Sequence, residues 1–96
     1  MSWRFRKDRH RRDTNHQAVV AELRAAGFSV LDISQVGDDA PDLLCARAGH
    51  ERLVELKHKN GSMSYGQVLF RDGWRGPPPL LARSADDVIR AWDKLV

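Results

Sequence analysis

Two short apolar stretches separated by a tight turn restrict the fold of this 96-residue chain more than any other feature. Residues 41–46 and 52–58 carry Leu, Val and Cys, and Arg47-Ala48-Gly49-His50 lies between them. Apolar runs of this length, bounded by turn residues, predict two β-strands joined as a hairpin. A hairpin that closes symmetrically about Ala48-Gly49 pairs residue 47 with 50 and residue 46 with 51.

The same register, when continued, places Asp42 directly opposite Glu55. Side chains alternate between the two faces of a strand, so Glu55 and Lys57 share one face and Leu56 points the other way. Opposed residues have Cβ atoms about 5 Å apart, and two carboxylates that close repel each other unless a cation lies between them. Mg²⁺ suits such a pair, because it binds through one or two carboxylates and keeps several waters.

This arrangement predicts a metal-dependent phosphodiesterase site, in which Lys57 holds or polarises a water or a phosphate oxygen. The alternative is a polar outer face of a half-buried sheet, with Glu55 paired to Lys57. That alternative explains the alternation equally well, but it does not explain the register that brings Asp42 opposite Glu55.

The rest of the chain supplies helices on either side of the hairpin. The sequence predicts a helix over 13–26, a strand over 28–33, a loop over 34–40, a helix over 64–74, an edge strand over 80–82 and a helix beginning at Ser84. The last helix is expected to bury Val88, Trp92 and Leu95, and Trp74 is also expected in the core. Asp38 and Asp39 are expected to be loop charges. The predicted fold class is therefore α/β, a single domain of order αβββαβα with a mixed sheet flanked by helices.

The basic character of the chain is concentrated at its N-terminus. The net charge is +3, but residues 1–12 contribute six basic groups against one acidic group, and residues 13–96 carry ten basic and twelve acidic groups. We therefore separate a basic arm, 1–12, from a domain, 13–96. The arm is expected to bind nucleic-acid phosphates, and the alternative is a solvated tail. Its basic residues are Arg4, Arg6, Lys7, Arg9, Arg11 and Arg12.

Composition excludes several other classes of protein. A hydrophobic fraction of 42% favours a globular fold. There is no apolar run long enough for a membrane span, and the charged N-terminus does not fit a secretory signal. Cys45 is the single cysteine, so an internal disulfide is impossible, and the histidines lack the spacing of a zinc site. A reducing cytoplasm is the expected compartment.

Pro41-Asp42 followed by Glu55-Leu56-Lys57 resembles the signature of the PD-(D/E)XK nuclease superfamily. More narrowly, residues 13–92 resemble small phage and prophage nucleases of the resolvase-like, VRR-NUC-like group. Further matches support the resemblance along the chain. They are Asp13-Thr14-Asn15 at the start of a helix, Gly37 before the first strand of the hairpin, Gln67 ten residues after Lys57, and Trp74-Arg75-Gly76. The resemblance implies a restriction-endonuclease-like core.

The resemblance also implies an activity, that of an Mg²⁺-dependent endodeoxyribonuclease. Asp42, Glu55 and the backbone carbonyl of Leu56 would hold the metal, and Lys57 would position the attacking water and stabilise the transition state. Hydrolysis would leave a 5′-phosphate. Mn²⁺ is expected to substitute for Mg²⁺, whereas Ca²⁺ is expected to support little turnover. Gln67 is expected near the site, where its amide can bond a phosphate or a catalytic carboxylate.

The first helix departs from the family pattern. Many relatives carry a Glu there that completes the metal site, whereas this chain has Asn15-His16-Gln17, and Glu22 lies farther along. Asn15 and Gln17 are therefore possible site residues; the alternative is that these three residues cap the helix or face solvent. His58 and Lys59, which follow Lys57, either contact backbone phosphates or form a solvated strand end.

By the same resemblance, the expected substrate is branched or nicked DNA, and the expected assembly is a homodimer, because a four-way junction needs two symmetric cuts. The chain would be a phage or prophage protein acting in the host cell. Two other functions remain open. One is a DNA-binding module of the same fold without useful catalysis. The other is a protein-interaction domain that blocks a host factor.

Overall fold

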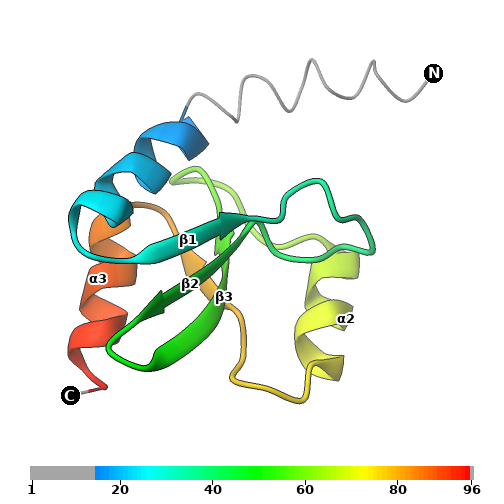
Figure 1. The fold of residues 1–96 in the computed structure, drawn as a ribbon. Helices are drawn as coiled ribbons and strands as arrows, with labels where there is room; N and C mark the ends of the chain where they lie inside the picture. Colours follow the sequence, from blue (N-terminus) through cyan, green and yellow to red (C-terminus); the bar gives the residue numbers. More distant parts are fainter. Residues whose placement is uncertain (1–14, 96) are drawn as a thin grey trace.

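The computed structural model describes residues 15–95, which form one four-stranded sheet and three helices (Figure 1). A first helix covers residues 15–25. It is followed by β1 (Ser29–Asp32), β2 (Leu43–Arg47), β3 (His50–Leu56), α2 (Tyr65–Gly73), β4 (Leu80–Ala82) and α3 (Ala85–Asp93). The predicted α/β class and the predicted order of elements are confirmed. The basic arm and the cap predicted at Asp13 or Thr14 lie outside the described residues.

The sheet is mixed, with the strands in the order β1-β2-β3-β4. β1 pairs antiparallel with β2 and β2 antiparallel with β3, whereas β4 pairs parallel with β3. A parallel pair requires a crossover connection, and α2 lies within it. β4 is an edge strand, as the sequence predicted. No helix among residues 15–95 is long and apolar enough to cross a bilayer.

The hairpin of β2 and β3 has the predicted register. Arg47 pairs with His50 and Ala46 with Glu51, and the pairing continues to Leu43 opposite Val54. The turn residues Ala48 and Gly49 have φ values of 55° and 81°. Positive φ at both central residues gives a turn whose twist matches that of the flanking strands, which favours this two-residue connection.

One face of the sheet carries the hydrophobic core. The first helix and α3 lie on that side and α2 lies on the other (Figure 1). The core contains Leu23, Leu43, Cys45, Val54, Val88 and Trp92, all almost fully buried. Trp92 of α3 meets the ring of Phe28 edge-on at 5.0 Å, and its indole N–H is shared between two carbonyl oxygens of the hairpin. Burial raises the pKa of the Cys45 thiol to about 11.

Two predictions about burial, those for Trp74 and Leu95, are wrong, and one of the alternatives for His16 is excluded. Trp74 is 45% exposed and stacks on Phe70, because it follows the last residue of α2 and that helix contributes nothing to the core. Leu95 is 46% exposed, because α3 ends at Asp93 before its apolar stripe reaches Leu95. His16 is neither a cap nor a solvent-facing residue; it is buried, with Nε2 3.2 Å from Oδ2 of Asp32.

Candidate active site

Asp42 lies immediately before β2, across from Glu55. Its backbone N–H donates to the carbonyl oxygen of Val54 at 3.0 Å, and its Oδ2 accepts a hydrogen bond from the N–H of Leu56 at 2.9 Å. These two bonds go to the residues on either side of Glu55. The hairpin register, continued by one residue beyond Leu43 and Val54, gives the same opposition. The geometric part of the sequence prediction, Asp42 facing Glu55, therefore agrees with the structure.

The backbone of Leu56 faces the same region. Its N–H is directed at Asp42, while the adjacent N–H of Lys57 turns the other way and donates to Ala82 of β4. The N–H and C=O of one residue in an extended strand point to the same edge. The Leu56 carbonyl is consequently directed toward the edge of β3 that Asp42 occupies. Asp42 and this carbonyl provide hard oxygen atoms of the type that Mg²⁺ prefers.

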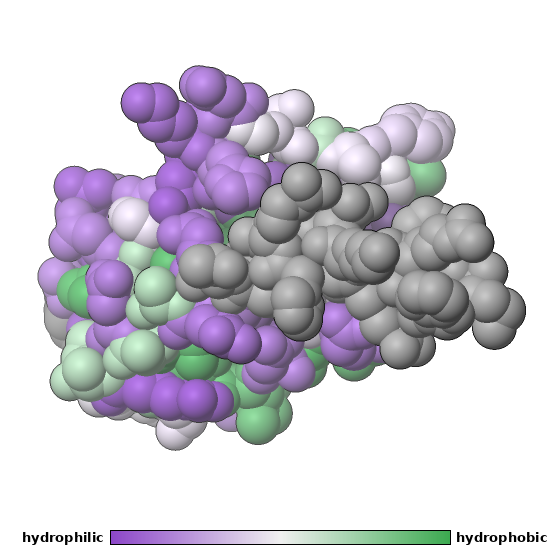
Figure 2. Space-filling view, turned by 90° about the horizontal axis from the view of Figure 1, so that it is seen from above, coloured by the Kyte–Doolittle hydropathy of each residue, from purple (hydrophilic) through white to green (hydrophobic). Residues whose placement is uncertain are grey.

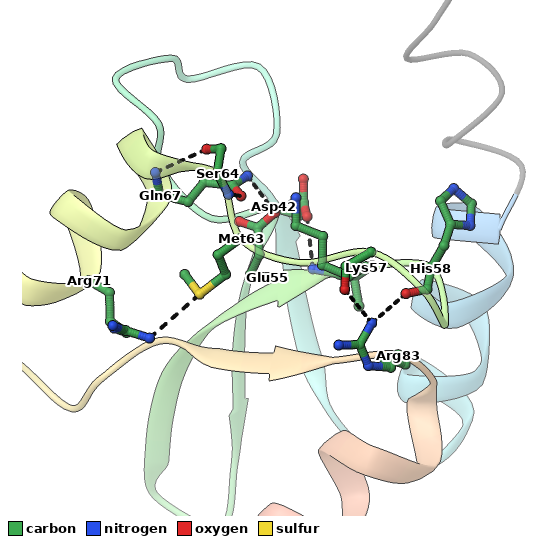
Figure 3. Close-up of polar contacts among 11 residues, drawn as sticks. Asp42, Glu55, Lys57, His58, Met63, Ser64, Gln67, Arg71 and Arg83 are labelled. Carbon is green, nitrogen blue, oxygen red and sulfur yellow. Dashed lines mark hydrogen bonds and ion pairs between the residues drawn. The ribbon is translucent and has the colours of Figure 1, made fainter.

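Glu55 is a charged residue in a buried position, with only 4% of its surface exposed. Its Oε2 accepts a hydrogen bond from Gln67 Nε2 at 2.9 Å, and Nζ of Lys57 lies 3.8 Å from the same oxygen (Figure 3). A buried carboxylate is costly unless hydrogen bonds and an opposite charge compensate it. Gln67 and Lys57 provide that compensation, and both contact the same oxygen of the carboxylate, Oε2.

Gln67 is fixed by the first turn of α2. Ser64 caps this helix: its hydroxyl accepts from the N–H of Gln67 at 3.2 Å, and its own N–H donates to Gln67 Oε1 at 2.9 Å. This reciprocal pair is a capping box. With Oε1 occupied by Ser64, the amide nitrogen of Gln67 must point at Glu55. The prediction that Gln67 lies beside the carboxylates agrees with this bond.

Sequence reasoning missed a close approach between the loop before Asp42 and α2. The carboxylate of Asp39 lies against the α-carbon of Gly66, where an added Cβ would be 2.4 Å from Oδ2. A larger residue at position 66 would require the exposed Asp39 side chain to move away from α2. The signal in the sequence was a glycine at the second position of a helix, where it is otherwise unfavourable. Asp39 is thus more than the loop charge that we expected.

The first-helix residues are placed apart from this group. Asn15 and Gln17 are exposed, and within residues 15–95 neither forms a hydrogen bond or ion pair with Asp42, Glu55 or Lys57. Gln17 instead lines an open pocket of about 190 Å³ that His16, Arg24 and Asp32 also line. No described contact therefore joins the first helix to the proposed metal ligands.

Asp32, at the end of β1, is held by its own neighbours. Burial raises the pKa of its carboxyl, but hydrogen bonds from the hydroxyl and N–H of Ser34, together with nearby His16, outweigh burial and leave the pKa below its ordinary value. Through its contact with His16, Asp32 connects the end of β1 to the first helix.

Within residues 15–95 there is no group of three or more His, Cys, Asp and Glu side chains suited to a metal ion. The ligands available for Mg²⁺ are therefore two carboxylates, the Leu56 carbonyl and water, a set that this ion accepts. His58 and Lys59 are exposed at the turn after β3. Viewed from above, the described surface is mainly hydrophilic, with apolar residues in small patches (Figure 2).

Comparison with models of protein families, with curated proteins and with solved structures finds no match to this chain. The resemblance to PD-(D/E)XK nucleases accordingly stays a prediction that depends on the residues above.

Proposed function

We propose that this protein is an Mg²⁺-dependent endodeoxyribonuclease of the PD-(D/E)XK type. One observation carries the proposal: Asp42, Glu55 and Lys57 gather around the last residues of β3, with Gln67 fixing the Glu55 carboxylate. A buried carboxylate held beside a second carboxylate and a lysine is unusual for a merely structural position, because its desolvation must be offset by several partners.

Asp42, Glu55 and the carbonyl of Leu56 would hold the metal. When bound, Mg²⁺ supplies an activated water and offsets the charge that builds on the phosphate. Oδ2 of Asp42 keeps its bond to the Leu56 N–H, which aims the carboxylate. Gln67 prevents Glu55 from turning away, because its amide is itself tied to Ser64. Mn²⁺ is expected to replace Mg²⁺, and Ca²⁺ is expected to bind with little turnover.

We assign to Lys57 a direct role in the reaction, through contact with the attacking water and the phosphate. Its side chain is mostly buried, and its ammonium lies beside Glu55, so few other positions are open to it. From there it can donate to the attacking water and to a non-bridging phosphate oxygen, where negative charge grows in the transition state. The water oxygen bonds to phosphorus as the bond to the 3′ oxygen breaks, which leaves a 5′-phosphate and a 3′-hydroxyl.

The proposed substrate is branched or nicked DNA, and the proposed assembly is a homodimer in the cytoplasm of a host cell. Exposed apolar side chains, Leu31 on β1 and Leu69 on α2 among them, are available for contacts between two copies. Sedimentation of the protein with a four-way junction should give two protomers for each junction. A single protomer on each junction would contradict the dimer.

The activity is tested by a cleavage panel that compares four-way junction, flap, nicked, single-stranded and linear duplex DNA, each with and without Mg²⁺. We expect cleavage only with Mg²⁺ or Mn²⁺, strongest on a branched or nicked substrate. Labelling of the product ends with and without prior phosphatase treatment should reveal a 5′-phosphate. Absence of cleavage on every substrate, by protein that binds DNA, would overturn the proposal.

Substitutions at the site should separate catalysis from folding. Asp42→Ala, Glu55→Ala and Lys57→Ala are each expected to lower the cleavage rate by at least about a hundredfold, because each removes a group that acts on the transition state. Glu51→Ala is the matched control, since Glu51 lies on the same strand and the same face as Glu55 but is exposed. Circular dichroism checks that each variant is folded. Normal cleavage by all three site variants would exclude this site.

A DNA-binding module without useful catalysis is the second candidate function. It is favoured by the lack of an acidic side chain at Asn15 or Gln17. Under this alternative the basic arm supplies the affinity. The panel distinguishes the two functions, because the module binds branched DNA but adding Mg²⁺ produces no product.

A further inference from the structure

Arg83 differs from the ion-paired arginines in the described part of the chain. Arg47, Arg71 and Arg90 each form an ion pair with an aspartate. The guanidinium of Arg83 instead uses Nη1 to donate to two backbone carbonyls, those of His58 at 2.5 Å and Gly61 at 2.7 Å (Figure 3). Carbonyl oxygens fix a guanidinium but do not neutralise it. Arg83 is therefore an immobilised cation without a direct ion pair among residues 15–95; its charge also acts on the carboxylate of Asp87, which accepts a hydrogen bond from its backbone N–H.

The position of Arg83 relates it to the proposed active site. β3 and β4 are parallel, with Glu55 beside Leu81 and Leu56 beside Ala82. Continuing this register by one residue places Arg83 beside Lys57, on the face that Glu55 and Lys57 share. Neighbouring strands are about 4.8 Å apart. The cation of Arg83 thus extends from the same end of the sheet at which Asp42 and Glu55 meet.

The two carbonyl contacts leave donors for a ligand. A guanidinium carries five N–H groups, and the three on Nε and Nη2 have no acceptor among residues 15–95. His58 and Lys59 are exposed in the turn that Arg83 holds. The N–H of Gly61 also donates to the His58 carbonyl, so the turn and the guanidinium form one bonded unit. A rigid cation with a free edge of donors matches a phosphodiester, which accepts two parallel hydrogen bonds from arginine.

We propose that Arg83 binds a backbone phosphate of DNA beside the scissile one, and that the turn 58–61 holds its guanidinium ready for this contact. The inference rests on the proposed function for the identity of the ligand. Because Nη1 already bonds two carbonyls, the side chain loses little further freedom on binding. Lysine cannot replace it fully, because an ammonium does not offer a second edge of donors in a fixed plane.

The test measures binding of a labelled nicked duplex without divalent metal, by fluorescence anisotropy over a series of NaCl concentrations. The full chain is used with Arg83→Met, Arg83→Lys and the control Arg90→Met. Arg90 pairs with two aspartates on the surface of α3, so its removal changes the net charge equally. We expect Arg83→Met to bind about tenfold more weakly. The slope of the logarithm of the binding constant against the logarithm of the NaCl concentration should also become less steep by about 0.9, the value for one phosphate contact.

Arg83→Lys should keep the slope and bind with intermediate affinity, and Arg90→Met should bind as the wild type does. An unchanged slope for Arg83→Met, or an equal decrease for Arg90→Met, would overturn the inference. If Arg83→Met does not fold, NMR of the wild type still decides. The Nε–H resonance of Arg83 should shift on addition of the duplex while that of Arg90 stays in place, and a stationary Arg83 resonance would count against the contact.

These outcomes separate the inference from the proposed function. If binding depends on Arg83 but no DNA is cleaved, the phosphate contact is supported and the proposed nuclease activity is contradicted. If DNA is cleaved but Arg83→Met has the same salt dependence of binding as the wild type, only the phosphate contact of Arg83 is contradicted. If the wild-type protein binds no DNA at low salt, both the phosphate contact and the nuclease activity are contradicted.

Discussion

α2 and α3 are matched in length and in the serine that caps each of them, but different forces hold them in place. Both helices have nine residues, and each is capped by a serine whose hydroxyl accepts from the N–H three residues on. α3 buries Ala85, Val88 and Trp92, whereas α2 buries no residue. They also lie on opposite sides of the sheet (Figure 1).

The third residue of each helix shows what the difference means. In α2 it is Gln67, whose side chain returns to the Ser64 N–H and also reaches Glu55. In α3 it is Asp87, which accepts from the N–H of Arg83 and makes no contact with the proposed active site. α3 is thus held by apolar burial. α2 is instead linked to the sheet by a polar contact from its first turn, the hydrogen bond of Gln67 to Glu55, which implies that α2 mainly positions Gln67 beside that carboxylate.

The largest effect is expected from truncating the buried aromatic of α3. Trp92→Ala removes the edge contact with Phe28 and the indole hydrogen bonds to the hairpin, so we expect a loss of about 3–5 kcal/mol in the free energy of unfolding. Trp74→Ala at the end of α2 should cost less than about 1 kcal/mol, because that ring is half exposed. Urea denaturation measures both. Equal losses would mean that α2 is also held by burial.

A smaller effect is expected at the third residue of α2. Gln67→Glu retains the cap and suits a helix N-terminus, but it sets a second carboxylate against the buried Glu55. We expect a loss of about 1–3 kcal/mol in the free energy of unfolding together with loss of cleavage. Urea denaturation and the cleavage assay provide the two measurements. If α2 were only a capped surface helix, the same change would leave stability equal or improved.

The smallest effect concerns pH. The N–H of Arg83, with a contribution from Arg90, holds the pKa of the Asp87 carboxyl below its ordinary value of 3.8. Since the folded pKa lies below the unfolded one, the stabilisation is complete above that ordinary value and disappears as the pH falls through the folded pKa. Asp87→Asn should therefore lower stability at neutral pH by less than about 1 kcal/mol. Urea denaturation at a series of pH values should show this difference shrinking below about pH 4; a constant difference would contradict it.

Much of the fold follows from local patterns. Apolar alternation and the Ala48-Gly49 turn predicted the hairpin and its register, because a shift by one residue would expose Leu43 and Val54. Ser64 and Ser84 marked the starts of α2 and α3 through ordinary capping chemistry. The hairpin register also predicted that Asp42 faces Glu55, which is the part of the site that depends only on local pairing.

The predictions that failed concern which surface covers a residue. Trp74 and Trp92 follow similar apolar stripes, and only the packing of α3 against the sheet distinguishes them. The burial of His16 depends on Asp32 from another element. The contacts of Asp39 with Gly66 and of Arg83 with the turn 58–61 join segments far apart in the sequence. Periodicity cannot contain such information, because it describes one element at a time.

The buried thiol of Cys45 can be used to measure how often the sheet opens locally around β2. It lies on β2, which is paired on both edges, and its raised pKa keeps it protonated at neutral pH. Alkylating reagents attack thiolates, so they can modify this sulfur only while the strand is transiently separated from its neighbours. The rate of modification therefore measures how often the hairpin bearing Asp42 and Glu55 comes apart, without any label having to be introduced.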